Sequence, residues 1–212
     1  MINEIRKRML VWDSPLYVSH WILALCFVGA ILTQESEQFR LVHVTLGYTM
    51  LGIVGFRVIW GFIGSKYARF STIKPRFLKV HENIKAILSG ERQALMGLNA
   101  IGFLAAYVLM FLVLLVSATG YLTFNEIGPE LISELHELVG NALIAVVVVH
   151  VGSILLNALY HYLQKNNSTA TSKMSVIVVK ARAYKWVTVI ILLLMIYFWV
   201  FNLEFGNEST FS

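Results

Sequence analysis

Long stretches without a charged residue constrain this chain more than any other feature of its 212 residues. Four such stretches exist, and a fifth is interrupted only by Arg57. A helix needs about 20 mostly apolar residues to cross the hydrocarbon core of a bilayer, so each stretch is long enough to be a span. The predicted spans are residues 15–34, 41–63, 98–124, 136–163 and 185–203.

Composition supports an integral membrane protein. Hydrophobic residues make up 58% of the chain and charged residues 14%, whereas soluble domains carry about a quarter charged residues. The first span follows Arg6, Lys7 and Arg8, as a signal peptide would, but its apolar stretch is too long and no small-residue cleavage site follows. We therefore expect a retained helix. The single cysteine, Cys26, excludes an intrachain disulfide.

The basic residues predict the orientation. All lysines and arginines except Arg40 and Arg57 lie before the first span, between the second and third, or between the fourth span and Lys185, the first residue of the fifth. Because short loops rich in lysine and arginine stay in the cytoplasm, we expect a cytoplasmic N-terminus and a periplasmic C-terminus in a bacterial inner membrane. The net charge of +5 is thus explained by topology, and a nucleic-acid role is not indicated.

The basic segment between the second and third spans has a helical pattern of its own. Its apolar residues recur at spacings of three and four, with charged residues between them, and Pro75 and Gly90 suit its two ends. This pattern predicts an amphipathic helix over residues 75–89 that lies on the inner membrane surface.

Four histidines inside the spans can be compared by their depth. His20 lies near the inner end of the first span, and His43 and His136 begin the second and fourth at the outer face. His150 follows His136 by 14 residues, which is close to four turns and about 21 Å along a helix axis. The predicted orientation therefore pairs His43 with His136 at the outer level, and His20 with His150 at the inner level.

Two histidines that face each other across a helical bundle can hold a haem iron from both sides. Gly47 follows His43 by one turn, and Gly140 follows His136 by one turn, which leaves room for a flat macrocycle against the backbone. Each feature alone has a simpler explanation, since a single membrane histidine or glycine more often serves helix packing. Their coincidence at one depth favours four histidines that ligate two b haems.

Two further residues have two interpretations each, and a third has one. Arg57 follows His43 by 14 residues, so it could pair with haem propionates or extend to the inner interface. His161 lies near the inner boundary, where it could serve a quinone site, although packing or interfacial hydration is the simpler expectation. His81 is expected on the surface of the amphipathic helix.

Short motifs recur along nearly the whole chain: Val11-Trp12-Asp13-Ser14-Pro15, His20-Trp21, His43 with Gly47-Tyr48, Phe56-Arg57, Trp60-Gly61-Phe62, Gly64, Ala68-Arg69-Phe70, Thr119-Gly120, His136-Glu137, Gly140 and His150. Taken together, these motifs resemble the bacterial cytochrome b561 and nickel-iron hydrogenase b-type cytochrome family.

The resemblance implies an all-α transmembrane bundle as one domain over residues 1–212: a four-helix core with two b haems, plus a fifth C-terminal span and the interfacial helix. It implies that His20, His43, His136 and His150 are the iron ligands. It also implies that electrons pass between membrane quinone and a periplasmic redox partner. This partner would be a c-type cytochrome or a dehydrogenase or hydrogenase subunit. The chain departs from the family at residues 97–100, where Gly-Leu-Asn-Ala replaces Gly-His-Asn-Pro.

Two other functions agree less well with the sequence. The first is reduction of quinone by superoxide at the outer face, which the acidic outer loops disfavour because they repel an anion. The second is a haem-free transporter whose histidines line a proton or metal path. Such a path would require carboxylates within the spans, and the long stretches without charged residues contain none.

Overall fold

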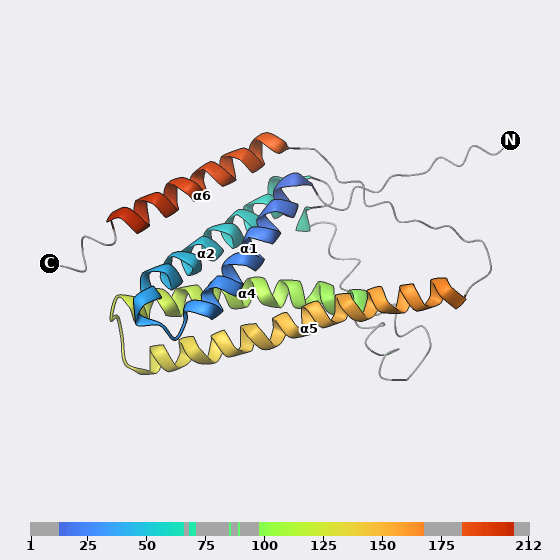
Figure 1. The fold of residues 1–212 in the computed structure, drawn as a ribbon, viewed down its shortest axis with the longest axis horizontal. Coiled ribbons are helices and arrows are strands. Elements are labelled where there is room, and N and C mark those ends of the chain that lie inside the picture. The colour runs from blue at the N-terminus through green and yellow to red at the C-terminus, as the bar shows by residue number, and fades with distance from the viewer. Residues whose placement is uncertain are drawn as a thin grey trace. The chain divides into compact units, whose positions relative to one another are not determined.

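The computed structural model describes residues 13–65, 68–70, 85, 89, 98–167 and 184–205. Within these ranges the regular structure is helical, and it contains no strand (Figure 1). The elements are α1 (Ser14–Thr33), the short 3-10 helix η1 (Glu37–Phe39), α2 (Arg40–Ile63), α4 (Leu98–Phe124), α5 (Leu131–Asn167) and α6 (Lys185–Phe205).

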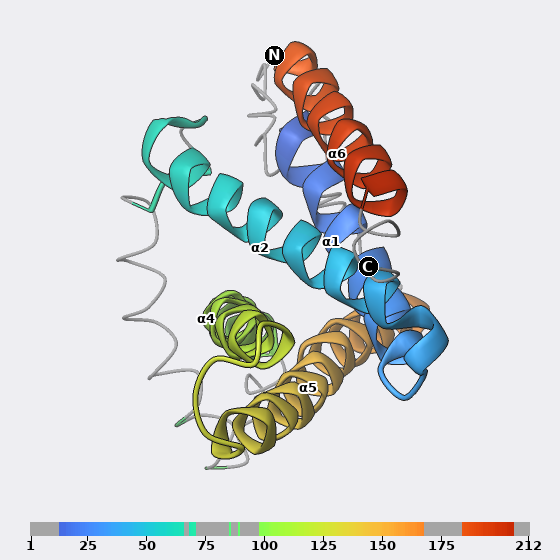
Figure 2. The same ribbon diagram turned by 90° about the vertical axis from the view of Figure 1, so that its left-hand side faces the viewer.

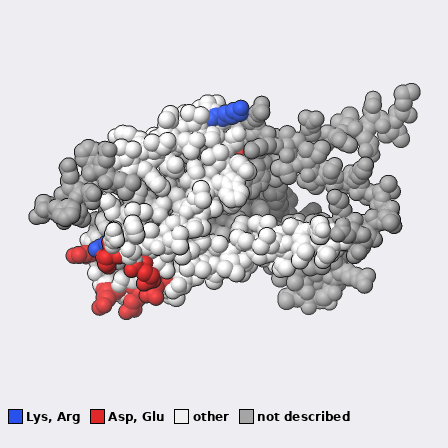
Figure 3. Space-filling model, viewed as in Figure 1, with Lys and Arg blue, Asp and Glu red and all other residues white. Residues whose placement is uncertain are grey.

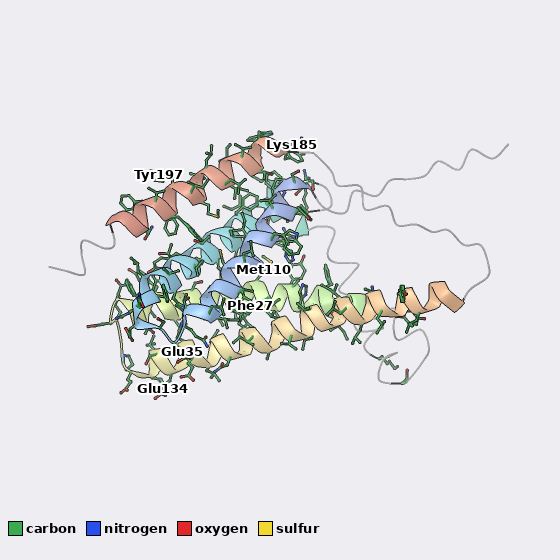
Figure 4. All side chains as sticks on the ribbon, viewed as in Figure 1. Phe27, Glu35, Met110, Glu134, Lys185 and Tyr197 are labelled. Atoms are coloured by element: carbon green, nitrogen blue, oxygen red, sulfur yellow. The ribbon has the colours of Figure 1, made fainter. Side chains whose placement is uncertain are left out.

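All five α-helices are long and apolar enough to cross a membrane, which confirms the predicted all-α fold with five spans. Their surfaces agree with a lipid environment, because large apolar side chains such as Leu32 and Tyr197 are 77% and 70% exposed. Figure 4 labels Tyr197 on α6. The interfacial helix expected over residues 75–89 falls outside the described residues, apart from Lys85 and Ser89.

The chain divides into two compact units, which are described separately. The first unit comprises Met1–Arg69 and Met174–Ser212, and therefore contains α1, α2 and α6. The second unit comprises Phe70–Lys173, and contains α4 and α5. That both units form the single domain expected from the sequence stays a prediction.

In the first unit, α1 and α2 form an antiparallel hairpin that is joined at residues 34–39, and α6 packs against both helices (Figures 1 and 2). At the other end of the hairpin, Asp13 is 1% exposed. Its carboxylate accepts hydrogen bonds from the Leu16 amide, in the first turn of α1, and from the Trp60 indole on α2. One buried carboxylate therefore holds the N-terminus of α1 against the C-terminal turn of α2.

An apolar cluster surrounds the Trp60 indole. The Phe56 ring stacks on it, and the Tyr184 ring meets it edge-on beside the start of α6. Ala68 and Val187 are buried in the same cluster. Aromatic pairs in these arrangements attract each other beyond the area that they bury. The cluster thus attaches the first turn of α6 to the end of α2.

The second unit is an antiparallel hairpin of α4 and α5, which lie side by side along their length (Figure 1). Residues 125–130 join the two helices, and Glu126 and Gly128 take positive φ angles of 56° and 102° in this turn. Helix α5 has 37 residues and is about 55 Å long, which exceeds the thickness of a hydrocarbon core.

Candidate functional site

In each hairpin we call the end where its two helices are joined the closed end, and the opposite end the open end. His43 lies in the first turn of α2, at the closed end of the first hairpin. Its Nδ1 atom is 2.9 Å from the Ala30 carbonyl oxygen of α1. The side chain is half-buried, and the hydrogen bond fixes the imidazole to the neighbouring helix.

His136 occupies the corresponding place in the second hairpin. Helix α5 begins at Leu131, five residues before the predicted start of this span, so His136 lies inside the helix and does not open it. Its Nδ1 atom is 3.0 Å from the Val116 carbonyl oxygen of α4 and 3.1 Å from the Thr119 hydroxyl. His136 is therefore tied to α4 near the closed end, as His43 is tied to α1.

His150 lies toward the open end of the second hairpin, where its Nδ1 atom is 3.0 Å from the Gly102 carbonyl oxygen of α4. His20 lies in α1, toward the open end of the first hairpin. The His20 side chain is exposed, and its ring meets the Trp21 ring edge-on at 6.2 Å between centroids. Each hairpin therefore carries one of the four histidines toward either end.

The three histidine–carbonyl bonds fix a chemical state. A carbonyl oxygen can only accept a hydrogen bond, so Nδ1 of His43, His136 and His150 carries the proton and donates it. In a neutral imidazole the lone pair then lies on Nε2, which is the atom that binds iron in a His-ligated haem. The hydrogen bond also fixes the ring orientation. These residues fit a haem iron.

The two glycines predicted beside the histidines have open surroundings. A Cβ atom built on Gly47 or on Gly140 would meet no described atom within 4 Å. Each glycine lies one turn from a histidine on the same helix face, so the backbone there can accept a flat group. Among the described residues, no group of three or more His, Cys, Asp or Glu side chains could hold a metal ion by itself. A haem differs from such a centre, because its porphyrin supplies four of the ligands.

The Arg57 side chain extends to the segment that follows α2. Its guanidinium Nη1 donates a hydrogen bond of 3.2 Å to the Ala68 carbonyl oxygen, in the segment that follows α2. The neighbouring Arg69 Nε donates to the Gly64 carbonyl oxygen at 2.8 Å. Both arginines therefore satisfy backbone carbonyls beyond the end of α2. A contact of Arg57 with haem propionates stays a prediction.

Two other histidines are not placed by the described side chains. Helix α5 extends through residue 161, but the side chain of His161 is outside the described set. His81 also falls outside the described residues. A role of His161 beside a quinone stays a prediction.

Acidic side chains gather at the closed end of the second hairpin. Figure 3 shows them in red beside the turn that joins α4 and α5, and Figure 4 labels Glu134 in the first turn of α5. Four exposed glutamates belong to this surface: Glu126, Glu130, Glu134 and Glu137. They give this end of the hairpin a negative charge.

Neither the carbonyl partners nor Thr119 could be identified as site residues from the sequence, in which Thr119 belongs only to a motif. Seventeen residues separate Thr119 from His136 along the chain, so spacing alone does not show their contact. The available signal was a hydroxyl residue next to Gly120, near the end of a span that precedes a histidine.

Comparisons with known proteins show the family of the chain. The family described as prokaryotic cytochrome b561 matches residues 11–166. A probable Ni/Fe-hydrogenase 1 B-type cytochrome subunit of Escherichia coli strain K12 is 26% identical, over 32% of this chain and 37% of that protein, and the same holds for its counterpart in Escherichia coli O157:H7. The chain thus spans little more than a third of these relatives. No solved structure matches significantly. From the family match over most of its length, the chain belongs to the prokaryotic cytochrome b561 family and is a membrane b-type cytochrome.

Proposed function

We propose that this protein is a di-haem cytochrome that transfers electrons between the membrane quinone pool and a periplasmic redox partner. The observation that carries the proposal is the set of three Nδ1–carbonyl bonds, at His43, His136 and His150. Each bond prepares an imidazole to bind iron through Nε2. Packing alone does not require the same nitrogen of three separate histidines to donate to a neighbouring helix.

The hairpins support a division of the four histidines into two levels. His43 and His136 lie toward the closed ends of their hairpins, and His20 and His150 lie toward the open ends. If the closed ends face the periplasm, as the loop charges predict, each unit contributes one ligand to each haem. We therefore assign His43 and His136 to an outer haem, and His20 and His150 to an inner haem.

A bound haem would supply one-electron transfer, and two imidazole ligands would complete the coordination of its iron. The protein would contribute the ligands, their orientation and an apolar surrounding. Gly47 and Gly140 would provide space beside the outer haem. Arg57 would stay near the inner level, where its guanidinium could also reach a propionate.

The acidic closed end of the second hairpin favours a protein partner with a basic surface. Its exposed glutamates would attract lysine-rich surfaces of a c-type cytochrome or of a dehydrogenase or hydrogenase subunit, and would speed their encounter at low ionic strength. The same charges would repel superoxide, so oxidation of superoxide is the weaker proposal. Quinone would exchange electrons with one haem from within the membrane, which matches an apolar surface open to lipid.

The decisive experiment is haem quantification on the purified chain, combined with single histidine variants. We expect a dithionite-reduced b-type spectrum and two haems per chain. His136→Ala should lower the content to one haem, and His43→Ala should remove the same haem. His150→Ala should remove the other haem, because His150 is assigned to the inner level.

A colourless protein from haem-replete cells would exclude the proposal. Two haems retained in His136→Ala would exclude His136 as a ligand. Equal loss of both haems from each single variant would contradict the division into two levels. His161→Ala is the matched control, since it changes a histidine of α5 that the ligand assignment does not use.

A further inference from the structure

Three polar groups form a closed triangle at His136. The imidazole Nδ1 is 3.0 Å from the Val116 carbonyl oxygen and 3.1 Å from the Thr119 hydroxyl oxygen. The hydroxyl oxygen is in turn 3.1 Å from the same carbonyl and 3.0 Å from the Leu115 carbonyl oxygen. Thr119 is 7% exposed, so these protein groups, and not bulk water, surround the imidazole proton.

The proton positions in this triangle follow from the chemistry of its members. The Leu115 and Val116 carbonyls can only accept, so the single hydroxyl proton of Thr119 points to them. The lone pairs of the hydroxyl oxygen then face the proton on Nδ1 of His136. His136 therefore donates one N–H to two acceptors, a carbonyl and a hydroxyl.

Gly120 completes the seat of this imidazole. A Cβ atom added there would lie 2.9 Å from Cε1 of His136 and 3.2 Å from its Nδ1. The ring thus rests directly against the backbone of α4, which holds Nδ1 within reach of the Thr119 hydroxyl. At His150 the nearby hydroxyl acts differently, since Ser153 donates at 2.8 Å to the backbone carbonyl of His150 and not to its ring.

We infer that Thr119 is a positioning residue, whose hydroxyl lowers the redox potential of the haem ligated by His136. The inference rests on the proposed function. A second acceptor draws the Nδ1 proton away from the ring, which raises the electron density on Nε2. A more basic imidazole stabilises ferric over ferrous iron, so the potential falls. Thr119 would in this way set the outer haem apart from the inner one.

The test is a potentiometric titration of the intact membrane protein with both haems bound. In Thr119→Val the bulk of the side chain is kept and the hydroxyl is lost, while the Val116 carbonyl still fixes the tautomer. We expect both haems to be retained and one of the two potentials to rise, with the other unchanged. Thr119→Ser, which restores a hydroxyl, should return that potential toward the original value.

Thr45→Val is the matched control. Thr45 is 3% exposed, and its hydroxyl also donates to the carbonyl one turn earlier, on Leu41. Loss of that hydroxyl should leave both potentials where they are. A shift of equal size in Thr45→Val would show a general effect of removing a buried hydroxyl, and would overturn the inference.

Three further outcomes would also overturn it: unchanged potentials in Thr119→Val, a lowered potential, or loss of haem from both Thr119→Val and Thr119→Ala. The last outcome would make the hydroxyl a requirement for haem binding and not a regulator of potential.

His136→Ala distinguishes a failure of this inference from a failure of the proposed function. If it loses one haem while Thr119→Val shifts nothing, only the role of Thr119 fails. If it keeps both haems, the proposed ligand set fails instead.

Discussion

Gly120 shows how little space a membrane-embedded imidazole leaves to its neighbours. Because an added methyl group would overlap the His136 ring at 2.9 Å from Cε1, Gly120→Ala must displace the ring or the helix. We expect this variant to bind about one haem fewer per chain than the unchanged protein, measured by haem extraction and protein assay. Gly152→Ala is the control, since a Cβ there meets no described atom within 4 Å. Full haem content in Gly120→Ala would show that the ring can move without loss of ligation.

Asp13 is a single residue on which two helix ends depend. Asp13→Ala removes the acceptor for the Leu16 amide and for the Trp60 indole, and leaves the indole N–H without its present acceptor. Loss of a cap and of a buried hydrogen bond should cost about 2–4 kcal/mol of unfolding free energy. Circular dichroism in detergent, followed against temperature, would measure the loss. Asp13→Asn keeps one oxygen acceptor and should lose less, whereas equal losses would contradict the double role.

The four histidines could be selected from the sequence, but their hydrogen-bond partners could not. To choose these histidines as candidate ligands, two observations were enough. A polar side chain inside a span requires a function, and the four histidines are predicted to fall at two depths. Which carbonyl an imidazole meets depends on the rotation and offset of two helices about each other. A spacing of 13 residues between Ala30 and His43, or of 20 between Val116 and His136, contains no such information.

At the scale of the elements, hydropathy predicted the number of helices well and their ends less well. The lipid core requires apolar residues, so the charge-free windows locate the five spans. Outside the core a helix can continue through charged residues, because only backbone hydrogen bonds are needed. Helix α5 therefore begins at Leu131, ahead of Glu134 and Glu137, although the predicted span began at residue 136.

Helix α6 is attached to the first hairpin by a small number of specific contacts. The Trp199 indole donates a hydrogen bond of 2.8 Å to the Thr49 hydroxyl, which itself donates to the Thr45 carbonyl. Trp199→Phe removes the first bond and leaves Thr49 satisfied, so we expect a loss of only about 1 kcal/mol in stability, with haem content unchanged. Thermal unfolding in detergent would measure it.

Trp186 supplies the control on the same helix. Its side chain is 66% exposed, so Trp186→Phe should change the unfolding temperature less than Trp199→Phe. Figure 4 labels Lys185, the first residue of α6, next to this position. A loss of haem in Trp199→Phe would contradict the view that α6 supports the first hairpin without belonging to the ligand set.

At the scale of the whole molecule, orientation decides which haem faces which partner. The loop charges predict that the closed end of the second hairpin lies in the periplasm, and that the basic segment between α2 and α4 lies in the cytoplasm. Ser133 and Ser89 are exposed, and the same prediction puts them on opposite sides of the membrane. The only native cysteine, Cys26, is 2% exposed, so replacing it by serine gives a background suited to thiol labelling.

We expect a membrane-impermeant maleimide to label Ser133→Cys in intact cells, and to label Ser89→Cys only after the membrane is permeabilised. The reason is the free energy of moving many lysines and arginines across the bilayer, which holds the basic segment inside. Labelling of permeabilised cells controls for thiol reactivity in both variants. Labelling of Ser89→Cys in intact cells, and of Ser133→Cys only after permeabilisation, would place the acidic closed end in the cytoplasm. The His43–His136 level would then face the cytoplasm, so the protein partner would have to be sought there.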